Sequence, residues 1–425
     1  MSISYAAVLP SSVSRRTIAA SVIGNVVEWF DFAVYGFLAA VIGKLFFPAI
    51  DSSASLIAAL GVFAAGFLMR PLGGVVFGYV GDRFGRGIAL YLSIGLMAVS
   101  TLGIGLLPTY ETGGVFAPIL MVACRMVQGL AVGGEYACSI VVLVETAPPR
   151  SRAFRGSWAC FSATAGNMLG SAVGAILFTT LSEDQIAAWG WRLPFLSGVL
   201  VALVGVYLRR NFTMPHGAPA VGGFRFLQAV TKEGRAMLNI VGLNMVAAIS
   251  FYMLYVYLVQ YMHDVAHIST ARALDINTLN MGILLLVMPA AGYISDRIGR
   301  KPLVYASMGL LIASSWPLFL LLHSPSELHV FLAQFGFTVI IGLYLGVVPA
   351  LMVEQVPASV RCTAVATTYN LTIALFGGTA PMLCVYLIDK SGNDIVPAIY
   401  LIGAATIALL TAARMQETAF RELRR

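Results

Sequence analysis

The stretch GYVGDRFGR, residues 78–86, recurs with the same spacing as GYISDRIGR, residues 292–300, so both copies read G-x-x-x-D-R-x-G-R. A second pattern, E-x-x-P-x-x-x-R, occurs at residues 145–152 and again at residues 354–361. The first pair lies 214 residues apart and the second pair 209 residues apart. Two patterns that repeat with nearly the same offset predict a chain built from two parallel halves.

The composition is that of an integral membrane protein. The chain is 59% hydrophobic and only 11% charged, whereas about a quarter of the residues of a soluble domain are charged. Its apolar runs have the length of about twenty residues that a helix needs to cross roughly 30 Å of hydrocarbon. Lipid cannot satisfy free backbone groups, so we expect an all-α membrane fold.

Twelve spanning helices in two six-helix halves are predicted. The first run carries no small-residue cleavage site, so we expect it to be retained. The halves are residues 1–208 and 237–425, and a central cytoplasmic loop at 209–236 joins them. The later part of this loop is either a short amphipathic helix on the membrane surface or a solvated basic loop. The predicted spans are 17–41, 55–80, 88–107, 114–144, 154–181, 191–208, 237–262, 273–295, 303–322, 328–350, 361–388 and 395–414.

The basic residues predict the orientation. Of the 26 lysines and arginines, 20 fall on the side that holds both termini and alternate loops. Positive residues accumulate in cytoplasmic loops, so this side is expected to be the cytoplasm. Topology therefore explains the net charge of +7, and nucleic-acid binding is not expected because no basic cluster is interleaved with aromatic residues. The five cysteines do not suggest a disulfide framework.

Two acids stand in the first span, within GNVVEWFDFAVYGF, residues 24–37. On a helix Glu28 and Asp31 share one stripe with Tyr35. Carboxylates are costly in hydrocarbon and repel each other when close, so at least one is expected to exchange a proton. In the alternative interpretation both stay ionised and tie this helix to neighbouring arginines.

Span four carries a second polar stripe that includes Arg125, Gln128 and Glu135. Arg125 and Glu135 are about 15 Å apart along the helix, so each needs a partner on another helix. Arg125 could bind the acids of span one or a solute carboxylate, and a structural bridge between these spans is the alternative. For Arg70, which precedes Pro71 in span two, structural pairing is favoured over solute binding.

Two spans of the second half carry polar and aromatic groups. Tyr252 and Tyr255 lie in span seven, where aromatic faces could hold a quaternary ammonium, although packing and interface anchoring are the commoner uses. Tyr369 and Asn370 lie in span eleven beside FGGTAP, residues 376–381, whose glycines and proline predict a bent helix.

The repeated loops are expected to gate the cytoplasmic side. Asp82 and Asp296 can cap or pair with a helix N-terminus, and arginines of the same loops can bridge Glu145 or Glu354. Breaking and remaking such pairs would bias which face of the protein is open. The predicted gating residues are Asp82, Arg83, Arg86, Glu145, Arg152, Asp296, Arg297, Arg300, Glu354 and Arg361.

The paired loops on twelve spans resemble the major facilitator superfamily. Within it, GNVVEWFDFAVYGF, GFLMRPLGG, CRMVQGLAVGGEY and GWRLPF are similar to the metabolite:proton symporters, whose members carry proline and betaine, 2-oxoglutarate, citrate or shikimate. The resemblance covers nearly the whole chain. It implies transport by alternating access in a bacterial inner membrane, with both termini cytoplasmic.

These observations predict a proton-coupled symporter that imports a small carboxylate-bearing metabolite, either an organic acid or a zwitterion. An exporter is the alternative. No enzymatic activity, cofactor or metal is expected, since no Walker A, H-E-x-x-H or G-x-S-x-G pattern occurs. The expected partners are the solute, protons and lipid, and the expected functional unit is a monomer. Proton coupling is assigned to Glu28, Asp31 and Glu135, and solute binding to Arg125, Gln128, Tyr35, Arg70, Tyr252, Tyr255, Tyr369 and Asn370.

Overall fold

The computed structural model describes residues 15–49, 51–84, 86–133, 135–199, 203 and 223–424. Side chains are described in these ranges except at 15–22, 78–79, 81–84, 86–91, 135 and 223–229. The described chain is helical and contains no strand. Its α-helices are α1 (Arg15–Phe37), α2 (Ala39–Phe46), α3 (Ser52–Leu68), α4 (Arg70–Phe84), α5 (Arg86–Leu106), α6 (Tyr110–Gly113), α7 (Phe116–Val132), α8 (Glu135–Glu145), α9 (Arg152–Thr180), α10 (Glu183–Ala188), α12 (Gly223–Tyr252), α13 (Leu258–Asp264), α14 (Thr270–Ile298), α15 (Arg300–Leu321), α16 (Glu327–Leu345), α17 (Val348–Glu354), α18 (Arg361–Thr372), α19 (Ala380–Ser391) and α20 (Val396–Arg414).

The described helices match the predicted spans. Among the described residues, nine stretches are long and apolar enough to cross a membrane, and a tenth is a bent pair, Ile23–Phe37 with Ala39–Phe46, that turns by 60°. Leu92–Leu106 is a shorter apolar helix at the predicted third span. In the predicted sixth span, 191–208, the structure describes residues 191–199 and 203. The all-α membrane fold is therefore confirmed.

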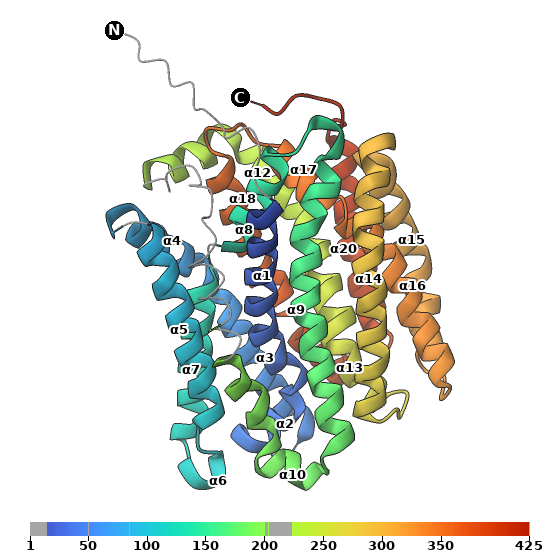
Figure 1. Cartoon of the computed structure of the whole chain (residues 1–425). Helices are drawn as coiled ribbons and strands as arrows, with labels where there is room; N and C mark the ends of the chain where they lie inside the picture. Colours follow the sequence, from blue (N-terminus) through green and yellow to red (C-terminus); the bar gives the residue numbers. More distant parts are fainter. Residues whose placement is uncertain are drawn as a thin grey trace.

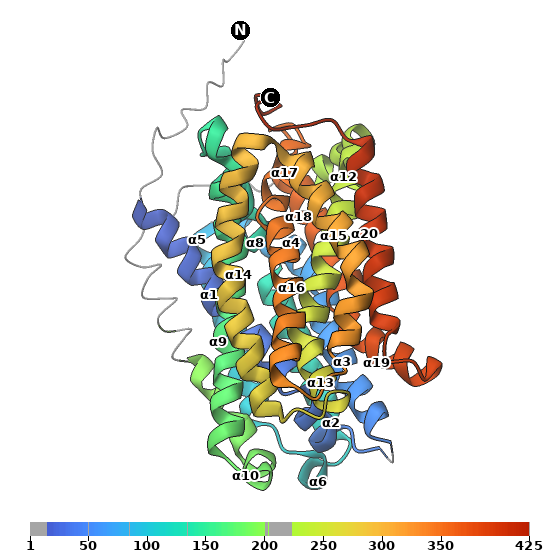
Figure 2. The ribbon, with the colours of Figure 1, turned by 90° about the vertical axis from the view of Figure 1, so that its right-hand side faces the viewer.

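The helices run side by side along one axis (Figures 1 and 2). The C-terminal tail and the first described turns of α1 lie at one end, while α6 and α10 lie at the other. Helices from the first part of the chain pack directly on helices from the second, namely α9 on α14, α8 on α18 and α3 on α19. These contacts enclose the centre of the molecule between residues that are distant in the sequence.

Two of these spans contain π-helical segments. One is Met253–Tyr257, between α12 and α13, and the other is Ile373–Gly377, between α18 and α19. The second overlaps residues 376 and 377 of the stretch 376–381, where the sequence predicts a bend. π-helical turns often occur at functional sites, because the extra residue re-aims the side chains around it.

The central loop is described only from residue 223. There α12 begins and continues into span seven, with non-helical dihedrals at Glu233 (φ −120°, ψ 20°). The part of the loop before Gly223 lies outside the described residues. The division at residues 208 and 237 stays a prediction.

Candidate functional site

The two acids of span one are both buried, at 6% and 2% exposure for Glu28 and Asp31. Glu28 Oε1 lies 3.8 Å from Arg70 Nη2 on α4. Asp31 is directed to other elements, because its Oδ2 accepts a hydrogen bond from Thr101 of α5 at 3.4 Å and its Oδ1 faces the backbone of Gly198. The neighbouring acids therefore face different helices.

Arg125 is linked to Asp31 through two intervening side chains. Its Nη1 donates to Gln128 Oε1, Gln128 Nε2 donates to Thr101 Oγ1 at 2.8 Å, and Thr101 donates to Asp31. The guanidinium lies 4.2 Å from the centroid of the Phe32 ring of span one. Span four and span one are thus connected by stacking and a polar chain, and the ion pairs of the described residues include none between Arg125 and either acid.

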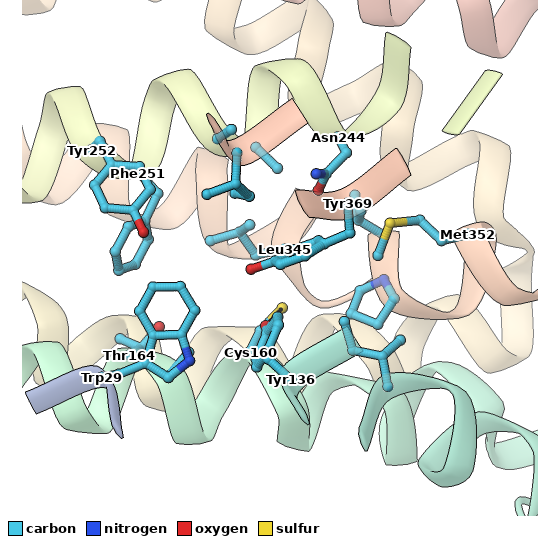
Figure 3. Close-up of a pocket in the computed structure, with 17 residues that line it drawn as sticks. Trp29, Tyr136, Cys160, Thr164, Asn244, Phe251, Tyr252, Leu345, Met352 and Tyr369 are labelled. Atoms are coloured by element: carbon cyan, nitrogen blue, oxygen red, sulfur yellow. Dashed lines mark hydrogen bonds between the residues drawn. The ribbon is translucent and has the colours of Figure 1, made fainter. Parts of the chain in front are cut away.

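A cavity lies between the two parts of the chain, with lining residues from both. Figure 3 shows Trp29, Tyr136, Cys160 and Thr164, from α1, α8 and α9, facing residues of α12 such as Phe251 across it. None of the described residues that line it is charged. Binding sites for small solutes are mostly apolar with a few placed polar groups, and this cavity fits that description.

Three buried polar groups of the cavity wall have no hydrogen-bond partner among the described residues. They are Trp29 Nε1, Asn244 Nδ2 and Tyr252 Oη, on side chains exposed by 4%, 3% and 2%. A buried donor without a partner costs about 1–3 kcal/mol, so such groups are rare unless something else binds them. All three can donate, which suits a negatively charged group of a solute.

Only part of the predicted solute site reaches this cavity. Tyr252 and Tyr369 line it. Tyr255 lies behind the wall, where its hydroxyl donates to Thr338 Oγ1 at 2.9 Å, and Asn370 Nδ2 donates to the Gly133 carbonyl at 2.6 Å. Among the predicted residues that do not line the cavity are also Arg125, Gln128, Tyr35 and Arg70.

Two cavity residues that the sequence analysis did not single out are Trp29 and Tyr136. Each carries a polar atom within an apolar span, and that signal is visible in the sequence. Trp29 directly follows the acid Glu28, and Tyr136 follows Glu135. In the sequence, an aromatic residue of the wall is thus a weaker functional signal than the acid beside it.

Arg70 connects the acid of span one to the cavity wall. Its guanidinium carbon lies 4.9 Å from the centroid of the Trp29 ring, and Trp29 lines the cavity. Arg70 is 1% exposed, and neither Nε nor Nη1 has a hydrogen-bond partner among the described residues. The guanidinium is thus held by one carboxylate and by aromatic faces.

Asp296 joins the two parts of the chain at the end that holds the C-terminus. Its carboxylate accepts hydrogen bonds from the backbone N–H groups of Ala153 and Phe154, at 3.0 and 2.9 Å. These groups belong to the first turn of α9, whose free N–H donors and positive dipole end attract an anion. An acid of α14 thereby binds the N-terminus of a helix from the other part of the chain.

Arg300 organises a buried charge cluster beside this contact. It lies 2.8 Å from Asp296 and 3.0 Å from Glu354, measured between nitrogen and carboxylate oxygen. Arg152 of α9 lies 3.9 Å from the same glutamate. The cluster therefore contains members from both parts of the chain.

Glu145 and Arg361 form a second ion pair between α8 and α18. Arg297 does not join these pairs, because it lies on the exposed face of α14, where its guanidinium stacks 4.0 Å from the Tyr293 ring centroid. In this conformation the described contacts of Arg297 include no glutamate, since a one-residue step from Asp296 turns the side chain by about 100°. The side chains of Asp82, Arg83, Arg86 and Glu135 lie outside the described residues.

The C-terminal tail covers this end of the molecule. The carbonyl of Arg421 accepts a hydrogen bond from Arg152 at 2.7 Å. The carbonyl of Arg424 accepts one from Arg361 at 2.8 Å. The tail therefore binds arginines that also belong to the ion pairs between the two parts of the chain.

A helical membrane bundle with a central polar-aromatic cavity, and with ion pairs between its parts at one end, defines a membrane transporter. A family model described as Major Facilitator Superfamily matches residues 21–381. The chain belongs to this superfamily and, by its relatives, to the metabolite:proton symporter branch. It is a multi-pass transporter and not an enzyme.

Two bacterial relatives illustrate this placement. The "Proline/betaine transporter" of Salmonella typhimurium is 37% identical, in an alignment that covers 96% of this chain and 85% of the relative. The "Glycine betaine/proline/ectoine/pipecolic acid transporter OusA" of Dickeya dadantii has the same identity and coverage. Among solved structures, the xylose transporter XylE from E. coli, in a partially occluded inward open conformation, is similar with a TM-score of 0.75 at 20% identity, covering 96% of this chain and 99% of that one.

Proposed function

We propose that this protein is a proton-coupled symporter that imports a zwitterion carrying a carboxylate and a substituted ammonium, of the glycine betaine and proline class. The observation that carries the proposal is the set of three buried, unpartnered donors, Trp29 Nε1, Asn244 Nδ2 and Tyr252 Oη, in an aromatic cavity without a charged lining residue. The relatives, which are named for proline and betaine transport, support the same solute class.

Each part of such a solute has a chemical counterpart in the wall. A carboxylate would accept hydrogen bonds from the unpartnered donors, and bonds to a charged acceptor contribute about 1.5–3 kcal/mol each. An ammonium would lie against the ring faces of residues such as Tyr136, Phe251 and Tyr369, which attract cations through their quadrupoles. A quaternary ammonium has no N–H to satisfy, so a wall of ring faces suits it.

A zwitterion is favoured over a dicarboxylate by charge. The lining residues include no lysine or arginine. Two negative charges would lose their hydration without meeting a cation in the wall, and burying an uncompensated charge costs several kcal/mol. A zwitterion brings its own countercharge.

We infer that proton coupling acts through Glu28 and Arg70. When Glu28 is ionised it attracts the guanidinium at 3.8 Å. Proton binding would remove that attraction and leave the positive charge beside Trp29, which lines the cavity. A carboxylate would then bind more tightly, which links proton uptake to solute binding.

Asp31 is proposed as a second proton-exchanging acid. It is 2% exposed and its Oδ1 has no hydrogen-bond partner among the described residues. The chain through Thr101 and Gln128 would pass a change in its charge to Arg125. Glu135 stays in the same proposed role, although its side chain lies outside the described residues.

Alternating access would use the ion pairs at the C-terminal end as a cytoplasmic gate. We place the protein in a bacterial inner membrane with both termini in the cytoplasm, as the distribution of lysine and arginine suggests. Opening would break pairs such as Glu145 with Arg361 and rebuild them on closing. One chain contains every group that this cycle uses, so a monomer is the proposed unit.

The test is uptake into proteoliposomes with an inward proton gradient, using labelled glycine betaine, proline, 2-oxoglutarate, citrate and shikimate. Accumulation of glycine betaine or proline that collapses with a protonophore is the expected result. Accumulation of a dicarboxylate instead would overturn the proposed solute class. Gradient-driven efflux of the solute from the same vesicles, with no uptake, would favour the exporter.

A further inference from the structure

Two cysteines meet across the contact between α8 and α18. Cys138 Sγ and Cys362 Sγ lie 3.2 Å apart, although 224 residues separate them in the sequence. Both side chains are partly exposed, so a small oxidant can reach them. A disulfide needs the sulfurs at about 2.05 Å, which a shift of roughly 1 Å would achieve.

The position of the pair gives such a bond a mechanical consequence. The Glu145–Arg361 ion pair joins the same two helices, and α18 is held a second time by the hydrogen bond from Asn370 to the carbonyl of Gly133. In a transporter of this fold these contacts must separate when the C-terminal end opens. A covalent bond here would prevent that separation.

We propose that Cys138 and Cys362 form an oxidation site, and that their disulfide holds the C-terminal end of the transporter closed. With hydrogen peroxide as oxidant, one thiol loses its proton and its thiolate sulfur attacks a peroxide oxygen. The O–O bond breaks, a sulfenic acid forms, and the leaving hydroxide takes up the thiol's proton to become water. The second thiol attacks the sulfenic sulfur, the S–O bond breaks, and a second water leaves. The two thiols lose two electrons, and one peroxide is reduced to two waters.

The other cysteines lack such a partner in their described contacts. Cys160 Sγ accepts a hydrogen bond from the Tyr136 hydroxyl at 3.5 Å, and Cys384 is fully buried at 0% exposure. In a reducing cytoplasm a disulfide is usually transient and regulatory. Reversible arrest of transport during oxidative stress is therefore the consequence we infer for this pair.

The test counts thiols and measures transport on the same full-length protein in proteoliposomes. After peroxide treatment and denaturation, labelling with a maleimide polymer is expected to fall from five thiols to three, and mass spectrometry should find the peptide of Cys138 joined to that of Cys362. Glycine betaine exchange should drop at least tenfold and recover with dithiothreitol.

Matched variants separate this site from general oxidative damage. The variants Cys138→Ser and Cys362→Ser should each retain transport activity after peroxide treatment. The variants Cys124→Ser and Cys384→Ser should lose transport activity, as the unmodified chain does. Five labelled thiols after oxidation, or a disulfide between other cysteines, would overturn the proposal. The thiol count does not depend on the solute, so it stands even if the proposed substrate is wrong. If the disulfide forms but transport does not slow, the proposal that it holds the C-terminal end closed is wrong.

Discussion

Asp31 lies at the end of a polar chain that begins at Arg125 and passes through Gln128 and Thr101. Each contact lies within one part of the chain, and the acid itself is away from the cavity wall. A change of charge at this acid can therefore reach other helices while the solute site stays intact. That separation makes coupling and binding independently testable.

We expect Asp31→Asn to abolish uphill uptake and to leave exchange of solute across the membrane active. The amide has nearly the same shape and can still meet Thr101, but it carries no exchangeable acid proton. Accumulation should fall at least about tenfold, equivalent to roughly 1.4 kcal/mol of lost driving force. The measurement compares gradient-driven accumulation with counterflow in one preparation. Uphill uptake with an unchanged proton dependence would contradict the assigned role.

Trp29→Phe tests the proposed hydrogen bond to the solute. It removes the Nε1 donor but keeps an aromatic ring beside Tyr136, whose centroid lies 5.4 Å away. Loss of one hydrogen bond to a carboxylate, about 1.5–3 kcal/mol, should weaken solute binding by roughly 10-fold to 150-fold. Binding would be measured by calorimetry or by the KM of uptake.

Trp191→Phe is the matched control for this variant. Trp191 is fully buried and its Nε1 also has no partner among the described residues, but it packs on Phe46 and Phe195 away from the cavity. Its substitution should leave the solute affinity unchanged. Equal losses in both variants would show that the effect is structural.

At the scale of elements, glycines decide how closely the spans of the first part approach. A Cβ on Gly129 of α7 would overlap with the carbonyl of Gly66 on α3, and one on Gly133 would overlap with the carbonyl of Arg70. Small residues permit such contact between membrane helices. The close crossing of α7 with α3 and α4 is what places Arg125 against the rings of α1.

Gly129→Ala should therefore destabilise the protein. Forcing a methyl group into this backbone contact is expected to cost about 1–3 kcal/mol, read as a lower Tm in detergent. Gly403→Ala in α20 is the control, since its Cβ would meet no atom within 4 Å. Alanine favours a helix over glycine by about 1 kcal/mol, so the control should be neutral or slightly more stable. Equal Tm values for the two variants would argue against the close crossing.

At the scale of the whole molecule, the ion pairs at the C-terminal end set the balance between conformations. Glu145→Gln should favour the state that is open at this end, because Arg361 loses its carboxylate partner. We expect a shift of about tenfold in the ratio of states, or roughly 1.4 kcal/mol. Spin labels at positions 150 and 359, in a chain without its native cysteines, would report the separation.

Arg272→Gln provides the comparison. Arg272 pairs with Glu327 at 2.7 Å between two exposed side chains of the second part of the chain. Exposed pairs contribute about 0–1 kcal/mol, and this one does not connect the two parts. Its loss should not change the label separation. A shift of the same size would mean that general surface charge sets the balance.

The tail contact should depend on pH through Glu417. Burial acts to raise the pKa of this carboxyl, but hydrogen bonds from the backbone N–H groups of Ala419, Lys301 and Arg300 outweigh it and hold the pKa below its ordinary value. The contact therefore stabilises the docked tail at pH values above the ordinary pKa of a glutamate. This stabilisation is lost as the pH falls through the lowered pKa of Glu417. Hydrogen exchange of residues 415–424 should rise at acidic pH, and Glu417→Gln should flatten this dependence.

By itself, the sequence determined the class of the molecule. The apolar runs predicted the spanning helices, because lipid cannot bind the backbone N–H and C=O groups and a helix satisfies them internally. The repeated loops indicated a transporter. The cost of a carboxylate in hydrocarbon also predicted that the acids of span one lie inside the bundle, and both are buried; their part in proton coupling stays a proposal. These conclusions depend on local composition and spacing.

Only the tertiary structure decided which side chains share a site. Helical periodicity gives the direction of a side chain around its own axis, but not which helix lies opposite or how that helix is rotated. The sequence therefore could not show that Trp29, Tyr136 and Asn244 form one wall. Nor could it show that Arg125 stacks on aromatic rings and does not pair directly with an acid. Cys138 and Cys362 lie on different helices, 224 residues apart, and only the packing of α8 on α18 brings their sulfurs together.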